Sequence, residues 1–529
     1  MGDLVMAVDV GSTAARAGIF DRAGHLLARA SRSFAVHRPA TDWAEHSSAE
    51  IWQSVCQAAR AALAEAGVDP ARVAGLAFDA TCSLVVLDGD GQPVGVSPGG
   101  EDRWNVIMWA DHRATAEAAE MTLTRHRVLD HVGGVMSPEM ELPKLLWLKR
   151  HAPAAWARMA KALDLADFLL WRATGRVAVS ACTVTCKWTY LAHEAPGWQA
   201  DFLELVGLPD LPEKAALPDR ALPIGTGAGP LSEAAAGALG LTTACVVGVG
   251  LIDAHAGGLG VLGGVPAAEL DRRLAMIAGT STCHMAVSPQ ARPVPGVWGP
   301  YFDAMVPGLW LNEGGQSASG ALLDHVLDLH AEGRGLGPDR HDRVSRRIDE
   351  LLAVDGPAML GPLTVLPDFH GNRSPLADPE ARGAIFGLSL DASFDGLCRL
   401  YYATALAIAL GTRQIVDALD RAGYAIDTLH LTGGHAANPV LVRLYADATG
   451  RRVVLPEQED GVLLGTATVA AAAAGLHPSL ADAGLAMVRS GRVVEPDRAL
   501  RSFFDCRYAL FLDLQQQEAR LREMLHQAV

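Results

Sequence analysis

The sequence predicts an α/β fold built in two halves that begin alike. Apolar runs of strand length alternate with amphipathic helix patterns, which is typical of layered α/β domains. Each half opens with two apolar runs joined by a turn of small and hydroxyl-bearing residues. Several glycines and a proline in residues 259–271 separate the halves, and we expect the main domain boundary there.

Composition limits the class of protein. The 529 residues include 44 basic and 60 acidic side chains, which gives a net charge of −16, and half of the residues are hydrophobic. Such a chain can bury a large core, and its length predicts two to four domains at roughly 100–200 residues each. The acidic balance argues against nucleic-acid partners and against binding to anionic membrane surfaces.

The cysteines and apolar runs predict a cytoplasmic protein. Eight cysteines are spread thinly, and the close pair Cys182 and Cys186 has no second pair nearby to complete a zinc site. We therefore expect free thiols in a reducing compartment. The first residues lack the basic region of a signal peptide. Gly, Asp or Arg interrupts each long apolar run before about 18 residues, so no membrane span is expected.

The first half is predicted to begin with a β-hairpin and a helix. Strands are expected at Leu4–Val10 and Ala17–Phe20, and Ser47 with Glu50 resembles a capping box before a helix from Ile51 to Gly67. Further predicted elements follow in chain order: strands Val73–Phe78 and Leu84–Leu87, helices Leu142–Arg150 and Pro153–Ala166, loops over residues 196–232, and a strand Ala244–Gly250.

The second half repeats this opening at the level of pattern rather than identity. Its predicted elements are strands Arg273–Ala278 and Cys283–Val287, a long helix Gly396–Ala422, a strand Thr428–Leu431, a helix Pro439–Ala448, a strand Arg452–Leu455 and a helix Gly465–Gly475. We therefore expect an N-terminal domain over residues 1–265, a C-terminal domain over residues 266–485 and a helical tail over residues 486–529.

The turn of the first hairpin has the residues of a phosphate cradle. Gly11, Ser12 and Thr13 follow a strand, so their backbone N–H groups and hydroxyls can face phosphate oxygens. Asp9 can hold a hydrated Mg²⁺, and Arg16 can neutralise phosphate charge. An ordinary hairpin with a polar tip would show the same residues.

A second turn of this kind opens the second half. Gly279, Thr280 and Ser281 repeat the small and hydroxyl-bearing pattern, although short glycine motifs also recur by chance. If the two turns faced each other across a cleft, they would clamp a nucleoside triphosphate.

A third turn follows the strand Thr428–Leu431. Gly433 and Gly434 allow the backbone to approach a flat ligand closely, while Asn438 and Pro439 suit the cap and first turn of a helix. A glycine turn with a good helix cap explains the same residues without a ligand.

Asp253 follows a predicted strand in a glycine-rich segment. A carboxylate in that position can face a cleft and accept the proton of a substrate hydroxyl in phosphoryl transfer. A capping aspartate is the plain alternative. His255, two residues on, has no evident partner in the sequence and is expected to be structural. The sequence contains no P-loop motif, and the stretch Gly225–Pro230 misses the dinucleotide fingerprint and is interpreted as linker.

In their order along residues 4–480, four motifs resemble those of the FGGY carbohydrate kinases. They are Asp9-Val10-Gly11-Ser12-Thr13, Gly250-Leu251-Ile252-Asp253-Ala254-His255-Ala256-Gly257, Gly279-Thr280-Ser281 and Thr432-Gly433-Gly434. The resemblance implies two actin-like (ribonuclease-H-like) ATPase domains with ATP and Mg²⁺ in the interdomain cleft. It implies phosphorylation of a terminal hydroxyl on a small sugar or polyol.

The resemblance also implies a role for each motif residue. Asp253 matches the catalytic base, and Asp9 matches the carboxylate associated with metal and phosphate. The remaining matches are Gly11, Ser12, Thr13 and Arg16 for the first phosphate turn, Gly279, Thr280 and Ser281 for the second, and Gly433, Gly434 and Asn438 for the adenosine loop.

Three further segments, Phe78–Ser83, Thr185–Trp188 and Asn312–Ala318, resemble the ribulokinase branch of the family. By that resemblance, the sugar pocket is lined by Cys82, Trp109, Lys187, Asp253 and Glu313. An ammonium group donates to sugar oxygens and a carboxylate accepts from hydroxyls, and pairing the lysine with the glutamate would offset the cost of burying either charge. A surface lysine is the alternative.

The segments Phe78–Ser83 and Asn105–Arg113 look closest to D-ribulokinases, so D-ribulose is the expected substrate. L-ribulose, ribitol and D-xylulose kinases stay open, because stereochemistry depends on pocket geometry. Rivals from other classes are an actin-like ATPase that binds protein clients and a degenerate kinase that senses sugar. The resemblance is compatible with a homodimer, but no interface is identifiable in the sequence.

Overall fold

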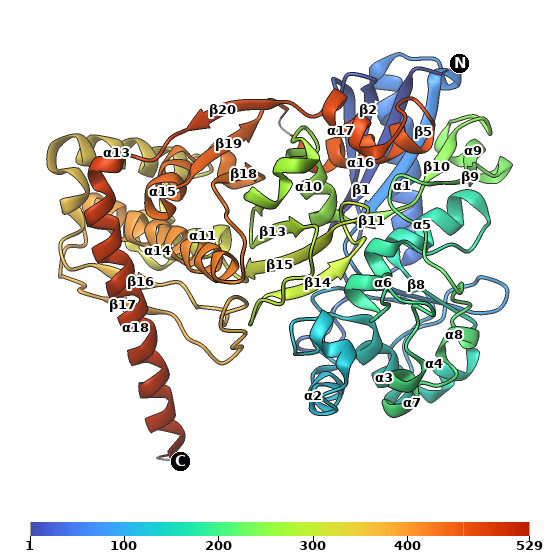
Figure 1. Cartoon of the computed structure of the whole chain (residues 1–529), viewed down its shortest axis with the longest axis horizontal. Coiled ribbons are helices and arrows are strands. Elements are labelled where there is room, and N and C mark those ends of the chain that lie inside the picture. The colour runs from blue at the N-terminus through green and yellow to red at the C-terminus, as the bar shows by residue number, and fades with distance from the viewer. Residues whose placement is uncertain (1, 459, 528–529) are drawn as a thin grey trace.

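The computed structural model of the chain describes residues 2–458 and 460–527 (Figure 1). Met1 and residues 528–529, which the predicted domain ranges include, lie outside the described residues, as does Glu459. Two large mixed sheets form the centres of two lobes, and helices α10 (Asp253–Leu262) and α16 (Gly461–Ala473) lie between these sheets. The predicted α/β class is confirmed.

The N-terminal sheet is built on the predicted hairpin. Its strands in spatial order are β3 (Leu26–Ser33), β2 (Ala14–Asp21), β1 (Leu4–Val10), β5 (Val73–Ala80), β10 (Val246–Gly248) and β9 (Gly227–Pro230), with β11 (Leu251–Ile252) also paired to β5. The register places Asp9 beside Arg16 on the antiparallel β2 and beside Asp79 on the parallel β5. The carboxyl ends of β1 and β5 therefore meet at one edge, where ligands of open α/β sheets bind.

Helices cover this sheet as the sequence predicts. The first, α1 (Ser48–Ala66), has the expected cap, because the Ser47 side chain accepts the Glu50 backbone N–H and Gly67 ends the helix in the left-handed region. Helix α5 (Leu165–Thr174) packs on the same sheet, and α9 (Glu233–Leu239) packs against α1.

An insertion adds a smaller sheet to the first lobe. Its strands are β4 (Glu45–His46), β7 (Val106–Ile107), β6 (Leu84–Leu87) and β8 (Lys161–Asp164), and its helices are α2 (Thr115–Leu123), α3 (Glu141–His151), α4 (Pro153–Arg158), α6 (Ala181–Lys187), α7 (Ala200–Leu205) and α8 (Leu211–Lys214). The predicted single helix Pro153–Ala166 is wrong, because β8 interrupts it to pair with β6, and strand pairing overrides local helix propensity. The region 196–232 also holds α7, α8 and β9 between its loops.

The second large sheet repeats the pairing pattern of the first. Its order is β14 (Trp298–Phe302), β15 (Trp310–Gln316), β13 (Thr282–Ser288), β12 (Arg273–Ala278), β18 (Thr428–Thr432), β19 (Arg452–Pro456) and β20 (Ser490–Val494). Strand β12 is antiparallel to β13 and parallel to β18, as β1 is to β2 and β5. The predicted repeat of the opening hairpin is confirmed at the level of topology.

The second lobe has the following further elements: α11 (Gly320–Leu329), α12 (Ala331–Arg334), α13 (Arg340–Asp355), β16 (Thr364–Leu366), β17 (Ala384–Phe386), α14 (Phe394–Arg421), α15 (Pro439–Thr449) and α18 (Arg501–Gln527). Helix α17 (Leu480–Met487) packs on α16 and shares the core of the first lobe (Figure 1). Short 3₁₀ helices occur at Pro70–Arg72, Arg127–His131, Ala267–Arg272, Gly356–Leu360, Gly434–Ala437 and Arg498–Leu500. The tail predicted as helical is helical in α18, which extends away from the body in Figure 1. It also contains β20, whose backbone completes the edge of the second sheet against β19.

Helix α16 belongs to the second half by sequence but packs on the first sheet. Its apolar residues Leu463, Leu464 and Ala467 share the hydrophobic core of β1 and β5. It crosses α10 at glycines: a Cβ on Gly260 would overlap the Gly461 carbonyl oxygen, and a Cβ on Gly465 would overlap that of Ala256. The two helices therefore touch backbone to backbone at the joint between the lobes.

Within the part of the chain that the structure describes, no helix combines the length and the apolar character needed to cross a membrane. The domain limits at residues 265 and 485 remain predictions.

The helix crossing generates a stability prediction. Gly260→Ala or Gly465→Ala is expected to lower the free energy of unfolding by about 1–3 kcal/mol, because backbone must move to admit the methyl group. The control is Gly237→Ala in α9, where a Cβ meets nothing within 4 Å. That change should be neutral or stabilising by about 0.5–1 kcal/mol. Urea unfolding measures all three variants, and wild-type stability of the first two would contradict the close crossing.

Candidate active site

The first turn brings Asp9 and Arg16 together at the edge of the N-terminal sheet. Arg16 Nε donates to Asp9 Oδ2 at 2.5 Å, and its Nη1 donates to Asp460 Oδ2 at 3.2 Å. Asp9 is buried, whereas the Arg16 side chain is 42% exposed. Arg16 is therefore held by two carboxylates while part of its guanidinium still faces outward.

Asp79 is a buried carboxyl that the sequence prediction did not select. Thr466 of α16 donates to its Oδ2, and its Oδ1 has no hydrogen-bond partner among the described residues. Burial raises the pKa of Asp79 well above its usual range, and the neighbouring Asp9 raises it further. Asp79 lies in the segment Phe78–Ser83 that carries the resemblance, and that resemblance was the only sequence signal for it; its place beside Asp9 follows from the strand register.

Asp253 lies at the start of α10, directly after β11. Its Oδ1 accepts from the Ala254 backbone N–H at 2.7 Å. Burial, and next to it the negative charge of Asp9, raise the pKa of Asp253 to about 6. A carboxyl with this pKa is ionised at neutral pH and can still take up a proton, which suits a general base.

Glu313 is held by two cationic side chains. Its Oε1 accepts from Arg373 Nη2 at 2.9 Å, and its Oε2 lies 3.3 Å from His255 Nε2. Burial would raise the pKa of Glu313, but the hydrogen bond from His255 and the charges of Arg373 and Lys187 lower it to about 2. The Glu313 carboxylate is therefore ionised at any physiological pH.

Two predictions change with this geometry. Lys187 is 3% exposed, so the alternative of a surface lysine is wrong. The predicted ion pair of Lys187 with Glu313 is not among the pairs within 4.0 Å in the described residues; Lys187 Nζ instead lies 4.6 Å from the Trp298 ring centroid. Glu313 pairs with His255 and Arg373, and neither partner could be chosen from the sequence because both are distant along the chain.

The predicted residue Cys82 lies close to Lys187, and Trp109 lies beside the first phosphate turn. Cys82 is 7% exposed, and burial raises its thiol pKa to about 12, with Lys187 among the charges that act on it. Trp109 donates from Nε1 to Ser12 Oγ at 2.9 Å and from its backbone N–H to Ser83 Oγ at 3.1 Å. Trp109 thus joins the first phosphate turn to the segment that carries Cys82.

Several buried polar atoms around Lys187 have no hydrogen-bond partner among the described residues. They include Thr185 Oγ1, Trp188 Nε1 and Tyr301 Oη. The nearby Glu141 and Lys144 also lack hydrogen bonds, but they form an ion pair with each other at 3.4 Å. Buried polar groups in folded proteins are nearly always hydrogen-bonded to protein, water or ligand. A ligand with many hydroxyl groups fits such surroundings.

The second phosphate turn and the third glycine turn line one cavity of about 340 Å³. Its walls include Gly279, Thr280, Gly434 and Asn438, together with His341 and Asp342 of α13. Gly433 has a φ of +90°, and a Cβ there would overlap Ala278, so glycine is required beside the turn. Ser281 lies in the same turn, its carbonyl oxygen accepting from the Gly279 N–H at 2.8 Å.

Asn438 caps a helix, as one of the two alternatives predicts, and it also lines the cavity. Its Oδ1 caps α15 by accepting from the backbone N–H groups of Val440 and Leu441 at 3.0 and 3.2 Å, and its Nδ2 donates to Tyr401 Oη at 3.0 Å. The same residue lines the cavity, so the cap holds the cavity wall in place.

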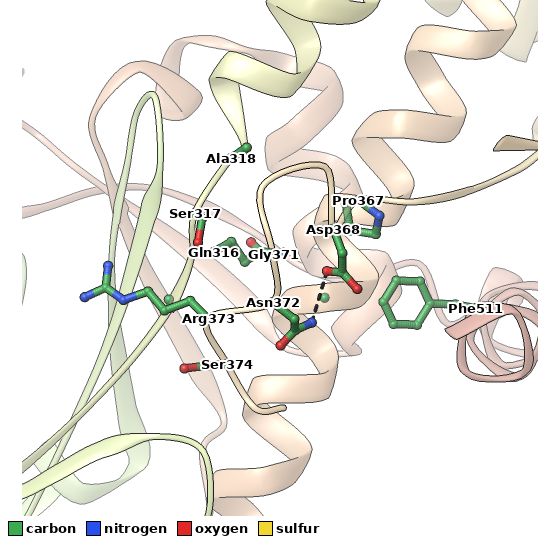
Figure 2. A pocket seen from close by; sticks show the side chains of 12 residues that line it. Gln316, Ser317, Ala318, Pro367, Asp368, Gly371, Asn372, Arg373, Ser374 and Phe511 are labelled. Atoms are coloured by element: carbon green, nitrogen blue, oxygen red, sulfur yellow. Dashed lines mark hydrogen bonds between the residues drawn. The ribbon is translucent and has the colours of Figure 1, made fainter. Parts of the chain in front are cut away.

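Arg373, which sequence reasoning missed, comes from a loop braced by α18. Figure 2 shows the hydrogen bond between Asp368 and Asn372, with Arg373 on one side of this bond and Phe511 of α18 on the other. Asn372 Nδ2 donates to Asp368 Oδ1 at 3.0 Å, and Gln515 Nε2 of α18 lies 3.4 Å from Asp368 Oδ2. The C-terminal helix therefore supports the loop that reaches Glu313.

Comparison with known proteins identifies the family. Models for the N-terminal and C-terminal domains of the FGGY family of carbohydrate kinases match residues 4–260 and 274–474. The chain belongs to this family. It is therefore a carbohydrate kinase, and the resemblance seen in its motifs is confirmed.

Relatives of the chain include proteins of several organisms. An FGGY carbohydrate kinase domain-containing protein of Danio rerio is 46% identical over 97% of both chains. The D-ribulokinase of Saccharomyces cerevisiae is 37% identical over 88% of this chain and 71% of its own. The crystal structure of xylulose kinase from Rhodospirillum rubrum, 26% identical, covers 99% of this chain and 100% of its own with a TM-score of 0.82. The two-domain actin-like fold is confirmed.

The bracing of Arg373 generates a prediction about stability and pH. Burial raises the pKa of Asp368 to about 6, above the value of about 3.9 for an exposed aspartate. The folded state therefore binds more protons between these values, so this group's contribution to stability falls as pH rises from about 4 to 6. Asp368→Asn should flatten this part of the profile, which corresponds to about 3 kcal/mol in wild type.

Urea unfolding of both proteins at a series of pH values between 4 and 8 measures the difference. The matched control is Asp349→Asn on the exposed face of α13, which should keep the wild-type slope. An unchanged slope in Asp368→Asn would contradict the buried, protonatable state of Asp368.

Proposed function

We propose that this kinase transfers the γ-phosphoryl group of ATP to the terminal hydroxyl of D-ribulose, forming D-ribulose 5-phosphate. The observation that carries the proposal is the grouping of three buried charged side chains, in which Glu313 lies near both Asp253 and Lys187, with the neutral thiol of Cys82 near Lys187. The 37% identity with a D-ribulokinase supports the choice of ketose.

The cavity behind the second phosphate turn suits the adenosine part of ATP. Gly279 and Thr280 of the second turn and Gly434 and Asn438 of the third turn all line it. The first turn, with Gly11, Ser12 and Thr13, lies at the end of β1 in the other lobe. Together the two turns can present backbone N–H groups to the phosphates.

Magnesium fits the acidic edge of the N-terminal sheet. Mg²⁺ is usually held by one or two carboxylates together with substrate phosphates, and Asp9 lies beside Asp79, whose Oδ1 is unpaired among the described residues. In residues 2–458 and 460–527, no group of three or more His, Cys, Asp or Glu side chains could hold a metal by itself. When bound, the ion would neutralise charge on the phosphoryl oxygens.

In the proposed reaction, Asp253 accepts the proton of the sugar's terminal hydroxyl. The hydroxyl oxygen forms a bond to the γ-phosphorus, the bond from that phosphorus to the β–γ bridging oxygen breaks, and ADP leaves with that oxygen. Glu313 accepts hydrogen bonds from other sugar hydroxyls, and Lys187 donates to the carbonyl or a hydroxyl oxygen. These contacts orient the ketose so that one hydroxyl faces Asp253.

A substrate panel tests the proposal. ADP release is measured with ATP and Mg²⁺ in the presence of D-ribulose, L-ribulose, D-xylulose, ribitol or no sugar. Preference for D-ribulose supports the assignment. Preference for another pentose or polyol keeps the mechanism but replaces the substrate, and ADP release that is independent of sugar favours an actin-like ATPase. No ADP release with any sugar favours a sugar sensor.

The role of Asp253 predicts a separation of binding from turnover. Asp253→Asn should reduce kcat by about 10²–10⁴-fold, the usual contribution of a general base, while isothermal titration still detects the ketose. In wild type, kcat/KM should fall as pH drops through about 6, because Asp253 must be ionised to accept a proton. Wild-type kcat in the variant would rule out Asp253 as the base.

The role of Lys187 predicts an effect on sugar affinity. Lys187→Met should raise KM for the ketose by about 10–100-fold, because a hydrogen bond to a charged donor contributes about 1.5–3 kcal/mol. KM for ATP should change little. The matched control is Lys161→Met. Lys161 lies on β8 of the insertion, and its ammonium is 5.7 Å from the ring centroid of Trp171. Equal effects of the two variants would contradict the proposed sugar contact.

A further inference from the structure

His255 is the buried centre of a chain of contacts that the proposed mechanism does not use. It lies on α10 two residues after Asp253 and is fully buried. Its Nε2 is 3.3 Å from Glu313 Oε2, and its Nδ1 is 3.1 Å from the Ala304 carbonyl oxygen and 3.0 Å from Cys182 Sγ. No partner of His255 was evident in the sequence, because its partners come from three other segments.

The partners of His255 determine its protonation state. The Ala304 carbonyl oxygen can only accept a hydrogen bond, so Nδ1 carries a proton. Glu313 is ionised, because Arg373 donates to its other oxygen at 2.9 Å, and an ionised carboxylate can also only accept. Nε2 therefore carries a proton as well, which makes His255 an imidazolium.

The electrostatics agree with this assignment. Burial would lower the pKa of His255, but Cys182 and Glu313 raise it to about 10. The Cys182 sulfur also accepts the Ile252 backbone N–H at 3.4 Å, which ties the start of α10 to α6 beside the ring. The imidazole is thus fixed on both sides.

We propose that His255 is a positioning residue of the sugar site, which as an imidazolium holds Glu313 ionised and at a fixed distance from Asp253. Asp253 and His255 share the first turn of α10, whereas Glu313 lies on β15 of the other lobe. The contact therefore sets the spacing between the group that accepts the proton and the group that orients the sugar.

This spacing matters because phosphoryl transfer depends on alignment. A displacement of about 1 Å at a reacting group can cost about 100-fold in rate. Arg373 holds the second oxygen of Glu313 and also lies 4.1 Å from the Trp298 ring centroid, so the carboxylate cannot turn away from His255. The inference rests on the proposed function for its kinetic consequence but not for the charge of His255.

The charge of His255 can be measured without any substrate. In protein labelled with ¹⁵N-histidine at pH 8, the His255 ring signals are assigned by their loss in His255→Gln. Both ring nitrogens should be protonated in wild type, and Glu313→Gln should leave one of them unprotonated. A neutral His255 in wild type, or no change in Glu313→Gln, would overturn the proposal.

Kinetics test the positioning role. His255→Ala should reduce kcat/KM for D-ribulose by about 100-fold, with a raised KM for the ketose and little change in KM for ATP. His255→Gln keeps a donor toward Glu313 and should recover part of the loss. The control is His430→Gln: His430 is a buried histidine of β18 whose pKa burial lowers to about 4.

Equal ketose KM values in His255→Ala and His430→Gln would overturn the positioning role, since that result describes a merely structural histidine. If His255→Ala does not fold, the comparison of His255→Gln with His430→Gln decides in the same way. If the wild-type enzyme phosphorylates no ketopentose, the proposed function fails. The protonation of His255 in labelled wild type and Glu313→Gln still confirms or overturns the ion pair between His255 and Glu313.

Discussion

The backbone contact between α10 and α16 is the constraint on which the site depends. Asp253 begins one helix, and Asp460 caps the other while pairing with Arg16. Thr466, one turn into α16, donates to Asp79 of the N-terminal sheet. Because glycines let these helices touch, carboxyl groups from two helices and two strands meet at one sheet edge.

The site separates charge into two regions. On one side, burial and the negative charge of Asp9 raise the pKa values of both Asp79 and Asp253, which suits a place for metal, phosphate and proton transfer. On the other side, cations surround Glu313, so its carboxylate stays ionised despite burial. Burial of an unpaired charge is costly, so the pairing of Glu313 with His255 and Arg373 is a condition for having a carboxylate in the sugar site at all.

Local elements were predictable from the sequence, and long-range partners were not. The two hairpins, the Ser47 cap and the ordered motifs depend on neighbouring residues, and they are found where the sequence predicts them. Strand β8 was missed because its stability comes from pairing with β6. His255 and Arg373 were missed as partners of Glu313 because 58 and 60 residues separate them from it, so no local pattern could link them.

The most direct test of this account is a crystal structure of Asp253→Asn with D-ribulose and a non-hydrolysable ATP analogue, since this variant should bind both without turnover. We expect the terminal hydroxyl within hydrogen-bond distance of residue 253, Glu313 and Lys187 in contact with the ketose, and the adenine in the cavity beside Gly434. A ketose bound away from Glu313 and Lys187, or turned with another hydroxyl toward residue 253, would contradict the account.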